Sequence, residues 1–164
     1  CVLEREDKVR ILDADALNII AAEHIDYKGS NEGKIIITPH IMEMSRLTGK
    51  TVSDIKEHMI ESAKEYAIQH SCICILKDAR TVVTDGQKVY INCTGNDGMS
   101  TGGSGDVLTG LIAGMAAIGL DAFDAACLSV YVHGKAGDLA AQQKGRTGMT
   151  ASDIAEAIAY VLKR

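Results

Sequence analysis

Short apolar runs alternate with longer amphipathic stretches along this chain. Continuous apolar runs at Val9–Leu12, Ile35–Thr38 and Ser71–Leu76 predict buried strands, because a strand covered on both faces needs no polar alternation. Apolar or small residues at helical spacing predict helices at Ala16–Glu23, Ser53–His70, Ala122–Gln143 and Thr150–Lys163. Strands that alternate with helices indicate an α/β fold with a mostly parallel sheet and helices on both faces.

Local turn signals complete the expected fold. Thr81–Thr84 and Lys88–Ile91 flank an Asp-Gly turn, which predicts a β-hairpin. Pro39 ends the second strand, and a short helix follows from His40 until Gly49. Thr150 and Asp153 are spaced like a capping box at the start of the last helix. No composition shift marks a domain boundary, so we expect a single domain.

Composition excludes several classes of function. The 164 residues carry a net charge of −5 and no Trp, which disfavours nucleic-acid binding and anionic membranes as partners. No apolar run is long enough to span a bilayer, and no signal segment opens the chain. The chain has five cysteines, and Cys72 and Cys74 lie in an apolar run. Buried free thiols in a reducing cytoplasm explain this pair better than a metal site.

Glycines are concentrated in Asn92–Gly114, where seven of the 23 residues are Gly. The densest part is Gly102–Asp106, and the apolar helical pattern begins at Val107. A glycine-rich loop that enters a helix leaves backbone N–H groups unpaired at the positive end of the helix dipole. The stretch therefore predicts an anion site, because Gly lets the backbone approach a phosphate closely.

Asp106 lies at this anion site, where a carboxylate would repel a phosphate. One interpretation is that Asp106 caps the helix, since Asp is a favourable N-cap residue. The other is that Asp106 takes a proton from a hydroxyl that attacks a bound phosphoryl group. The residues alone leave both roles open.

Polar residues follow three of the predicted strands. Asp13, His40 and Lys77 each come directly or within two residues after an apolar run, so we expect them at the carboxyl edge of the sheet. Asp15 and Asn18 are further candidates, although Asp15 is equally well placed as a helix cap.

Two more groups of residues are candidates for a functional site. Glu43 is three residues after His40, so both side chains would share one helix face. The segment Lys77–Thr81 contains two cations and a hydroxyl, and it fits either a phosphate or ribose site or a solvated loop. His133 in the small-residue helix is interpreted as a core residue.

The motifs together resemble the ribokinase-like superfamily, and within it the ADP/ATP-dependent NAD(P)H-hydrate dehydratases. The resemblance extends from about Val9 to the C-terminus. It rests on Leu12–Asn18, Thr38–His40 with Glu43 and Met44, Leu76–Lys77 with Thr81 and Val82, Thr94–Gly110, Val132–Gly134 and Ala136–Asp138.

The resemblance implies repair of damaged nicotinamide cofactor. ADP or ATP would phosphorylate the ring hydroxyl of hydrated NADH or NADPH, and loss of phosphate would restore the reduced cofactor. Asp106 would be the base, and His40, Asn96 and Asp106 would contact the hydrate. Glu43 would hold Mg²⁺ through water. The nucleotide site implied by the resemblance consists of Lys77, Asp78, Ala79, Arg80, Thr81, Gly103, Ser104 and Gly105.

The resemblance also implies a three-layer α/β/α sandwich that is truncated at its N-terminus. Residues 1–164 would be the C-terminal portion of one dehydratase domain, which would explain the start at Cys1. The expected partners are the missing N-terminal portion and further copies of the chain. Two alternatives remain: a small-molecule kinase of the same superfamily, such as a hydroxyethylthiazole kinase, and a non-catalytic nucleotide-binding fragment.

Overall fold

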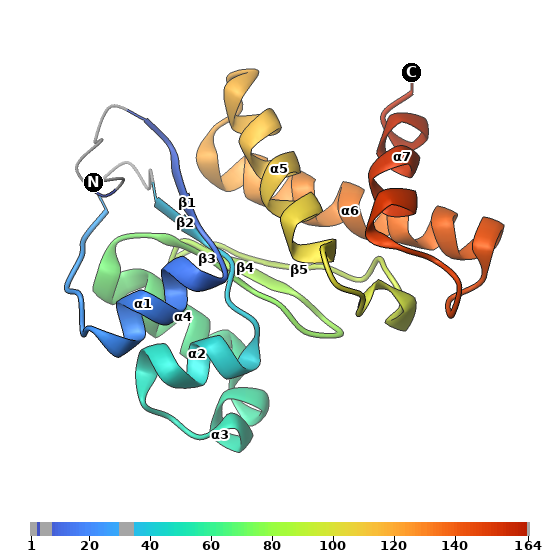
Figure 1. Ribbon diagram of the computed structural model, residues 1–164. Helices are drawn as coiled ribbons and strands as arrows, with labels where there is room; N and C mark the ends of the chain where they lie inside the picture. The colour runs from blue at the N-terminus through green and yellow to red at the C-terminus, as the bar shows by residue number, and fades with distance from the viewer. Residues whose placement is uncertain (1–2, 4–7, 30–34, 164) are drawn as a thin grey trace.

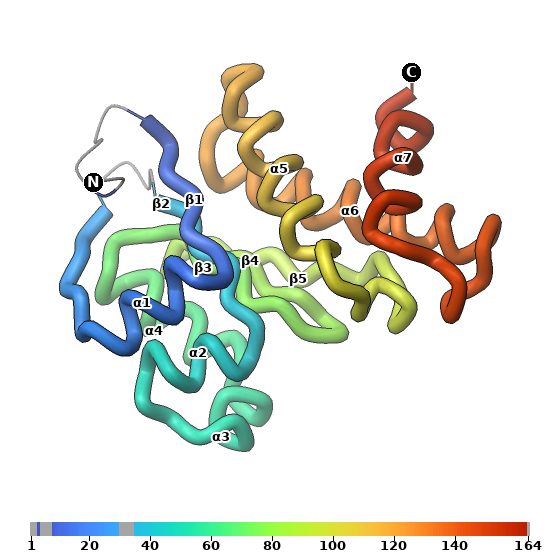
Figure 2. The backbone as a smooth tube through the Cα atoms, viewed as in Figure 1, coloured from blue at the N-terminus to red at the C-terminus, as the bar shows by residue number. Residues whose placement is uncertain are grey.

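A five-stranded sheet organises the chain (Figures 1 and 2). The computed structural model describes Leu3, residues 8–29 and residues 35–163, so Cys1 lies outside the described residues. The strands are β1 (Arg10–Leu12), β2 (Ile35–Ile37), β3 (Ile73–Leu76), β4 (Val82–Thr84) and β5 (Val89–Ile91), in that spatial order. β1, β2 and β3 pair in parallel, whereas β3, β4 and β5 pair antiparallel. The α/β fold and the hairpin are confirmed, and the hairpin makes the sheet mixed.

Helices cover both faces of this sheet, which confirms the three-layer architecture (Figure 1). One face carries α1 (Asp15–Ala22), α2 (Ile41–Thr48), α3 (Val52–Glu57) and α4 (Met59–His70). The other carries α5 (Ser104–Ala117) and α6 (Ala122–Lys144), and α7 (Ala151–Val161) packs on α6. Among the described helices, none is long and apolar enough to cross a membrane.

Strand β2 shows why the apolar runs lack alternation. Ile35 and Ile37 pack in the core under α1–α4, while Ile36 packs on the opposite face with Ile112 of α5. All three isoleucines have no exposed surface. A strand that is buried on both faces has no position for a polar side chain, so the apolar sequence follows from the layers.

The predicted helix over Ser53–His70 is wrong in one respect, because it is two helices. α3 and α4 are separated at His58, whose φ of −128° and ψ of 47° are not helical. The cap of α3 is Thr51, which lies one residue before the first helical position and whose side chain accepts a hydrogen bond from the Asp54 N–H.

Other helix ends follow the predicted signals. His40 is the N-cap of α2, and Gly49 ends this helix in the left-handed conformation with φ 71°. Thr150 and Asp153 form the expected capping box at the start of α7. These ends are set by neighbours in sequence, which is why local signals located them.

Candidate functional site

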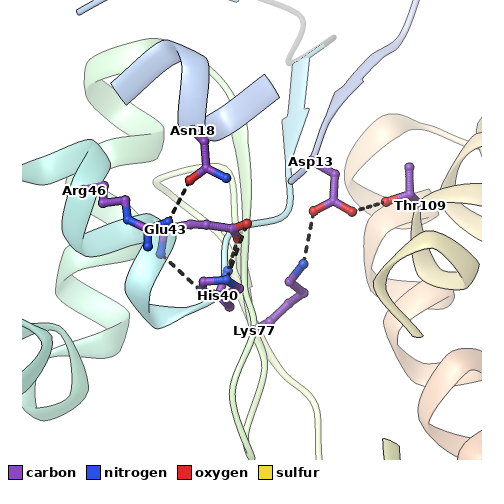
Figure 3. Close-up of polar contacts among 7 residues, drawn as sticks. All are labelled: Asp13, Asn18, His40, Glu43, Arg46, Lys77 and Thr109. Carbon is purple, nitrogen blue, oxygen red and sulfur yellow. Dashed lines mark hydrogen bonds and ion pairs between the residues drawn. The ribbon is translucent and has the colours of Figure 1, made fainter. Parts of the chain in front are cut away.

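The ends of β1, β2 and β3 bring Asp13, His40 and Lys77 to one edge of the sheet (Figure 3). His40 and Lys77 form a parallel β-bridge, and the Lys77 N–H donates to Pro39 O at 2.8 Å. The Lys77 Nζ lies 3.1 Å from Asp13 Oδ1. The predicted placement of these three residues at the carboxyl edge is therefore confirmed.

Asp13 has a partner for each of its carboxylate oxygens. Its Oδ1 accepts from Lys77, and its Oδ2 accepts from Thr109 Oγ1 of α5 at 2.8 Å. Burial raises the pKa of Asp13, but the Thr38 hydroxyl, the Lys77 ammonium and the Thr109 hydroxyl outweigh it, and the net pKa lies below its usual value. Asp13 is therefore ionised at neutral pH and pairs with a charged Lys77.

The glycine-rich loop enters α5 directly beside this pair. Gly103 is the N-cap with φ 87°, a conformation that favours Gly, and α5 begins at Ser104 instead of the predicted Val107. Gly103 O accepts the first hydrogen bond of the helix from the Val107 N–H at 3.1 Å, so the N–H groups of Gly105 and Asp106 precede the first helical donor. A Cβ on Gly105 would lie 3.6 Å from Lys77 Nζ. An ammonium group and free backbone donors therefore converge on one point.

Asp106 is exposed in the first turn of α5. The N-cap position belongs to Gly103, and no side chain makes a capping hydrogen bond there. The interpretation of Asp106 as the N-cap residue is therefore wrong, because it lies three residues inside the helix boundary. Its position still suits a carboxylate, since negative charge is favoured in the first turn. Its role as a base stays a prediction.

Ser104 is buried where α5 crosses α6. Its Oγ lies 3.4 Å from Nε2 of His133. Burial lowers the pKa of His133 to about 4, and the positive charge of Lys77 acts in the same direction. The imidazole is therefore neutral at pH 7. The interpretation of His133 as a core residue agrees with its burial, but its ring also contacts the predicted nucleotide loop.

The segment before the glycine loop is tied to α6 through Asp138. Asp138 Oδ2 accepts from the Gly95 N–H and Oδ1 accepts from Asn96 Nδ2, both at 3.1 Å. Asn96 Oδ1 accepts from the Gly98 N–H at 3.0 Å and thereby caps η2 (Asp97–Met99). Both ends of the Asn96 amide have partners within the fold, so its predicted contact with substrate would have to replace one of them.

His40 and Glu43 form a capping box at the start of α2. The Glu43 N–H donates to His40 Nδ1 at 3.2 Å, and the His40 N–H donates to Glu43 Oε2 at 2.8 Å. Glu43 is buried, whereas half of the His40 side chain is exposed. Within the described residues no group of three or more His, Cys, Asp or Glu is arranged to hold a metal ion. The Glu43 carboxylate is thus already engaged by the His40 N–H.

The remaining candidates lie around this edge. Asp78, Ala79 and Arg80 are exposed in the turn between β3 and β4, and Thr81 closes it by donating to Asp78 O at 3.3 Å. This turn is open to a ligand and to solvent alike.

The structure places two candidates of the first helix differently from their predicted roles. Asn18 Oδ1 accepts from Arg46 of α2 at 2.8 Å (Figure 3). Asp15 is not the cap of α1, because Ala14 holds the N-cap position with φ 48° and ψ −115° and no side chain caps this end.

Sequence reasoning missed Thr109 and Asp138. Thr109 lies four residues after Gly105, a helical spacing that placed both on one face. That face could be assigned to Asp13 only from the packing of α5 on the sheet. Asp138 belongs to a segment that carried the resemblance, but nothing in its spacing indicated a contact with Gly95.

Comparisons with known proteins show the relatives of this chain. A family model described as NAD(P)H-hydrate dehydratase matches residues 2–160. A bifunctional NAD(P)H-hydrate repair enzyme of Moorella thermoacetica is 48% identical over 99% of this chain and 31% of its own length. An ADP-dependent (S)-NAD(P)H-hydrate dehydratase of Neisseria meningitidis is 34% identical over 98% of this chain and 55% of its own length.

A solved structure shares the fold as well. The ADP/ATP-dependent NAD(P)H-hydrate dehydratase of Bacillus subtilis, co-crystallised with ATP and Mg²⁺ and soaked with CoA, has a TM-score of 0.83 and 33% identity. The match covers 92% of this chain and 54% of that structure. The chain thus spans between about a third and about half of the length of these relatives.

Proposed function

The chain belongs to the NAD(P)H-hydrate dehydratase family, and we propose that it takes part in the ADP- or ATP-dependent dehydration of hydrated NADH or NADPH. The observation that carries the proposal is the convergence of Lys77, Asp13 and Gly105 at the start of α5. Three segments far apart in the sequence meet there, and the exposed Asp106 follows Gly105 in the chain.

The start of α5 is suited to the phosphates of the nucleotide. The N–H groups of Gly103 and Gly105, the helix dipole and the Lys77 ammonium all favour negative charge at this point, whereas the Ser104 N–H would have to leave Thr101 O to join them. The turn Asp78–Thr81, which is mostly exposed, follows Lys77 directly and would line the rest of the nucleotide. The same donors would stabilise the charge that spreads over a phosphoryl group during transfer.

Asp106 supplies the base in this proposal. The ring hydroxyl of the hydrate attacks the terminal phosphorus of ADP or ATP, and the hydroxyl proton passes to the Asp106 carboxylate. The bond between that phosphorus and the bridging oxygen breaks, and the nucleotide leaves with one phosphate fewer. The C–O bond of the phosphate ester then breaks as a proton leaves the neighbouring ring carbon to solvent, which releases inorganic phosphate and restores the double bond of the reduced ring.

His40 and Glu43 have supporting roles in the proposal. His40 is exposed three residues after the end of β2, and its Nε2, which lies 3.5 Å from Glu43 Oε1, would contact the hydrate. Mg²⁺, when bound with the nucleotide, would neutralise phosphate charge. The buried Glu43 carboxylate could reach such an ion only through water. Asn96 completes the predicted substrate contacts if its bond to Asp138 opens.

The partners and the cellular location of the chain are proposals as well. We expect it to act with the N-terminal portion of a dehydratase domain, because the relatives extend well beyond the matched region. Further copies of the chain as partners and a cytoplasmic location stay predictions.

The decisive experiment measures cofactor repair. The chain is incubated with hydrated NADH or NADPH and with ADP or ATP, alone and with a separately produced N-terminal portion of a relative. The proposal expects recovery of reduced-nicotinamide absorbance and release of inorganic phosphate in equal amounts. Absence of recovery with either nucleotide in both preparations contradicts it.

The same experiment separates the two alternatives. A small-molecule kinase would consume the nucleotide and leave a stable phosphorylated product, without release of phosphate. A non-catalytic fragment would bind ADP without any turnover. The family match and the dehydratase relatives favour the dehydratase over the kinase.

A further inference from the structure

Asp13 divides its two carboxylate oxygens between two different parts of the fold. Oδ1 accepts from the Lys77 ammonium after β3, and Oδ2 accepts from the Thr109 hydroxyl on α5 (Figure 3). Only 11% of its side chain is exposed, against 23% for Lys77. The Asp13 carboxylate therefore connects Lys77, directly after β3, to α5, which begins at the predicted anion site.

The backbone next to Asp13 is held in a costly conformation. Ala14 has φ 48° and ψ −115°, which non-Gly residues rarely adopt. Such strain persists only where the surroundings enforce it. Here the Ala16 N–H donates to Asp13 O at 3.1 Å and the Thr38 N–H donates to Leu12 O at 3.2 Å, which fixes the chain on both sides of the turn.

Lys77 needs a counter-charge at this place. Its ammonium lies beside Gly105 in the first turn of α5, where the helix dipole disfavours a cation. A lysine side chain is flexible and strongly hydrated, so it would turn towards solvent if nothing held it there. Asp13 compensates the dipole and anchors the ammonium through a charged hydrogen bond.

We propose that Asp13 is a positioning residue that holds Lys77 ready for the phosphates of the nucleotide, with Thr109 fixing the orientation of Asp13. The inference rests on the proposed function. The effect that it predicts for removal of Asp13 on nucleotide binding is opposite to the effect of simple charge neutralisation. If Asp13 only cancelled the charge of Lys77, its removal would strengthen the binding of an anionic nucleotide. If it positions Lys77, its removal weakens that binding.

The test measures ADP affinity by calorimetry for the chain and five variants. Asp13→Asn is expected to weaken ADP binding about 10-fold, a usual size for coupling between contacting groups. Thr109→Val is expected to weaken binding in the same direction, whereas Thr109→Ser keeps the hydroxyl and retains affinity. The double variant Asp13→Asn/Lys77→Met should bind no worse than Lys77→Met alone. Unchanged or stronger ADP binding by Asp13→Asn overturns the inference.

A control and a second readout separate this inference from the proposed function. Asp15→Asn removes the same charge from an exposed position two residues away and should leave ADP affinity unchanged. The midpoint of the Asp13 carboxyl, followed by carbon NMR without ligand, should rise in both Lys77→Met and Thr109→Val. An Asp13 midpoint that moves in neither variant overturns the inference. A chain that never binds ADP contradicts the proposed function instead.

Discussion

His133 Nε2 lies 3.4 Å from Ser104 Oγ, at the point where α6 supports the start of α5. The imidazole is buried, and Lys77 adds a nearby positive charge, so the protonated form is disfavoured and the pKa falls from 6.5 to about 4. A neutral histidine thus lies beneath the glycine-rich loop. This relationship links the stability of the site to pH.

The free energy of unfolding should fall as pH decreases from about 6.5 to about 4. In this window the unfolded chain protonates His133 while the folded chain does not, so acid favours unfolding. The full effect is about 3 kcal/mol, at 1.36 kcal/mol per pKa unit. Above pH 6.5 both states are neutral, and this contribution to stability is fully present.

Urea unfolding at several pH values tests this expectation against the variant His133→Gln. The variant should lose part of the pH dependence, because its amide does not titrate. His24→Asn, an exposed histidine in a left-handed turn, is the control and should keep the slope of the parent chain. Equal slopes for the parent chain and His133→Gln would contradict a neutral buried imidazole.

Asp138→Asn should loosen the segment that precedes the glycine-rich loop. The carboxylate accepts hydrogen bonds from Gly95 and Asn96, and an amide has only one oxygen to replace both. We expect a loss of about 1–3 kcal/mol in the free energy of unfolding, as for hydrogen bonds to a charged group. Amide exchange over residues 94–103 should accelerate more than exchange in the sheet, as measured by hydrogen–deuterium exchange.

The matched control for this variant is Asp97→Asn. Asp97 pairs with Arg146 at 3.1 Å, but both side chains are largely exposed. An exposed ion pair contributes little, typically below about 1 kcal/mol. If both variants change amide exchange over residues 94–103 equally, the hydrogen bonds to Asp138 do not hold this segment in place.

Much of the fold could be predicted because its signals are local. Gly49 ends α2 and the Asp-Gly turn joins β4 to β5, since these features depend on residues adjacent in sequence. The order of apolar runs also predicted which residues follow the strands. The helix break at His58 was missed, because the apolar pattern continues through it and only its backbone angles interrupt the helix.

Part of the candidate site could also be predicted from the sequence. The glycine pattern indicated an anion site, and the residues after β1, β2 and β3 were expected to converge. The bond from Thr109 to Asp13 was not predictable, because it depends on how α5 is rotated against the sheet. The strained turn at Ala14 gave no signal either, since alanine is not typical of that conformation.

Gly134→Ala should destabilise the chain strongly, unlike the same substitution elsewhere in a helix. A Cβ on Gly134 of α6 would overlap the Thr94 side chain and lie 2.8 Å from the Thr94 backbone, which cannot move without shifting the loop. We expect a loss of about 1–3 kcal/mol from overpacking. Gly114→Ala in α5 has no atom within 4 Å of the new Cβ and should gain up to about 1 kcal/mol from helix propensity.

Urea unfolding of the two variants measures this contrast. The comparison is matched, because both positions lie inside helices and both substitutions add the same methyl group. Similar changes for Gly134→Ala and Gly114→Ala would indicate that the loop at Thr94 does not pack closely on α6.

Asp106→Asn tests the proposed base. The variant keeps the size of the side chain and removes its negative charge. Turnover in the cofactor-repair assay should fall by roughly 10² to 10⁴, the usual contribution of general acid–base catalysis. ADP affinity should hold or improve, because a negative charge beside the phosphates has gone. Stability should fall by less than about 1 kcal/mol, since only the favourable interaction with the helix dipole is lost.

Asp124→Asn is the matched control, because Asp124 is also an exposed acidic residue in the first turn of a helix. It should share the small loss of stability and leave turnover unchanged. The Asp106 carboxylate lies in the first turn of α5, in the field of the helix dipole. Its effectiveness would come from its placement against the ring hydroxyl. Near-normal turnover in Asp106→Asn would reduce Asp106 to a charge that complements the helix dipole.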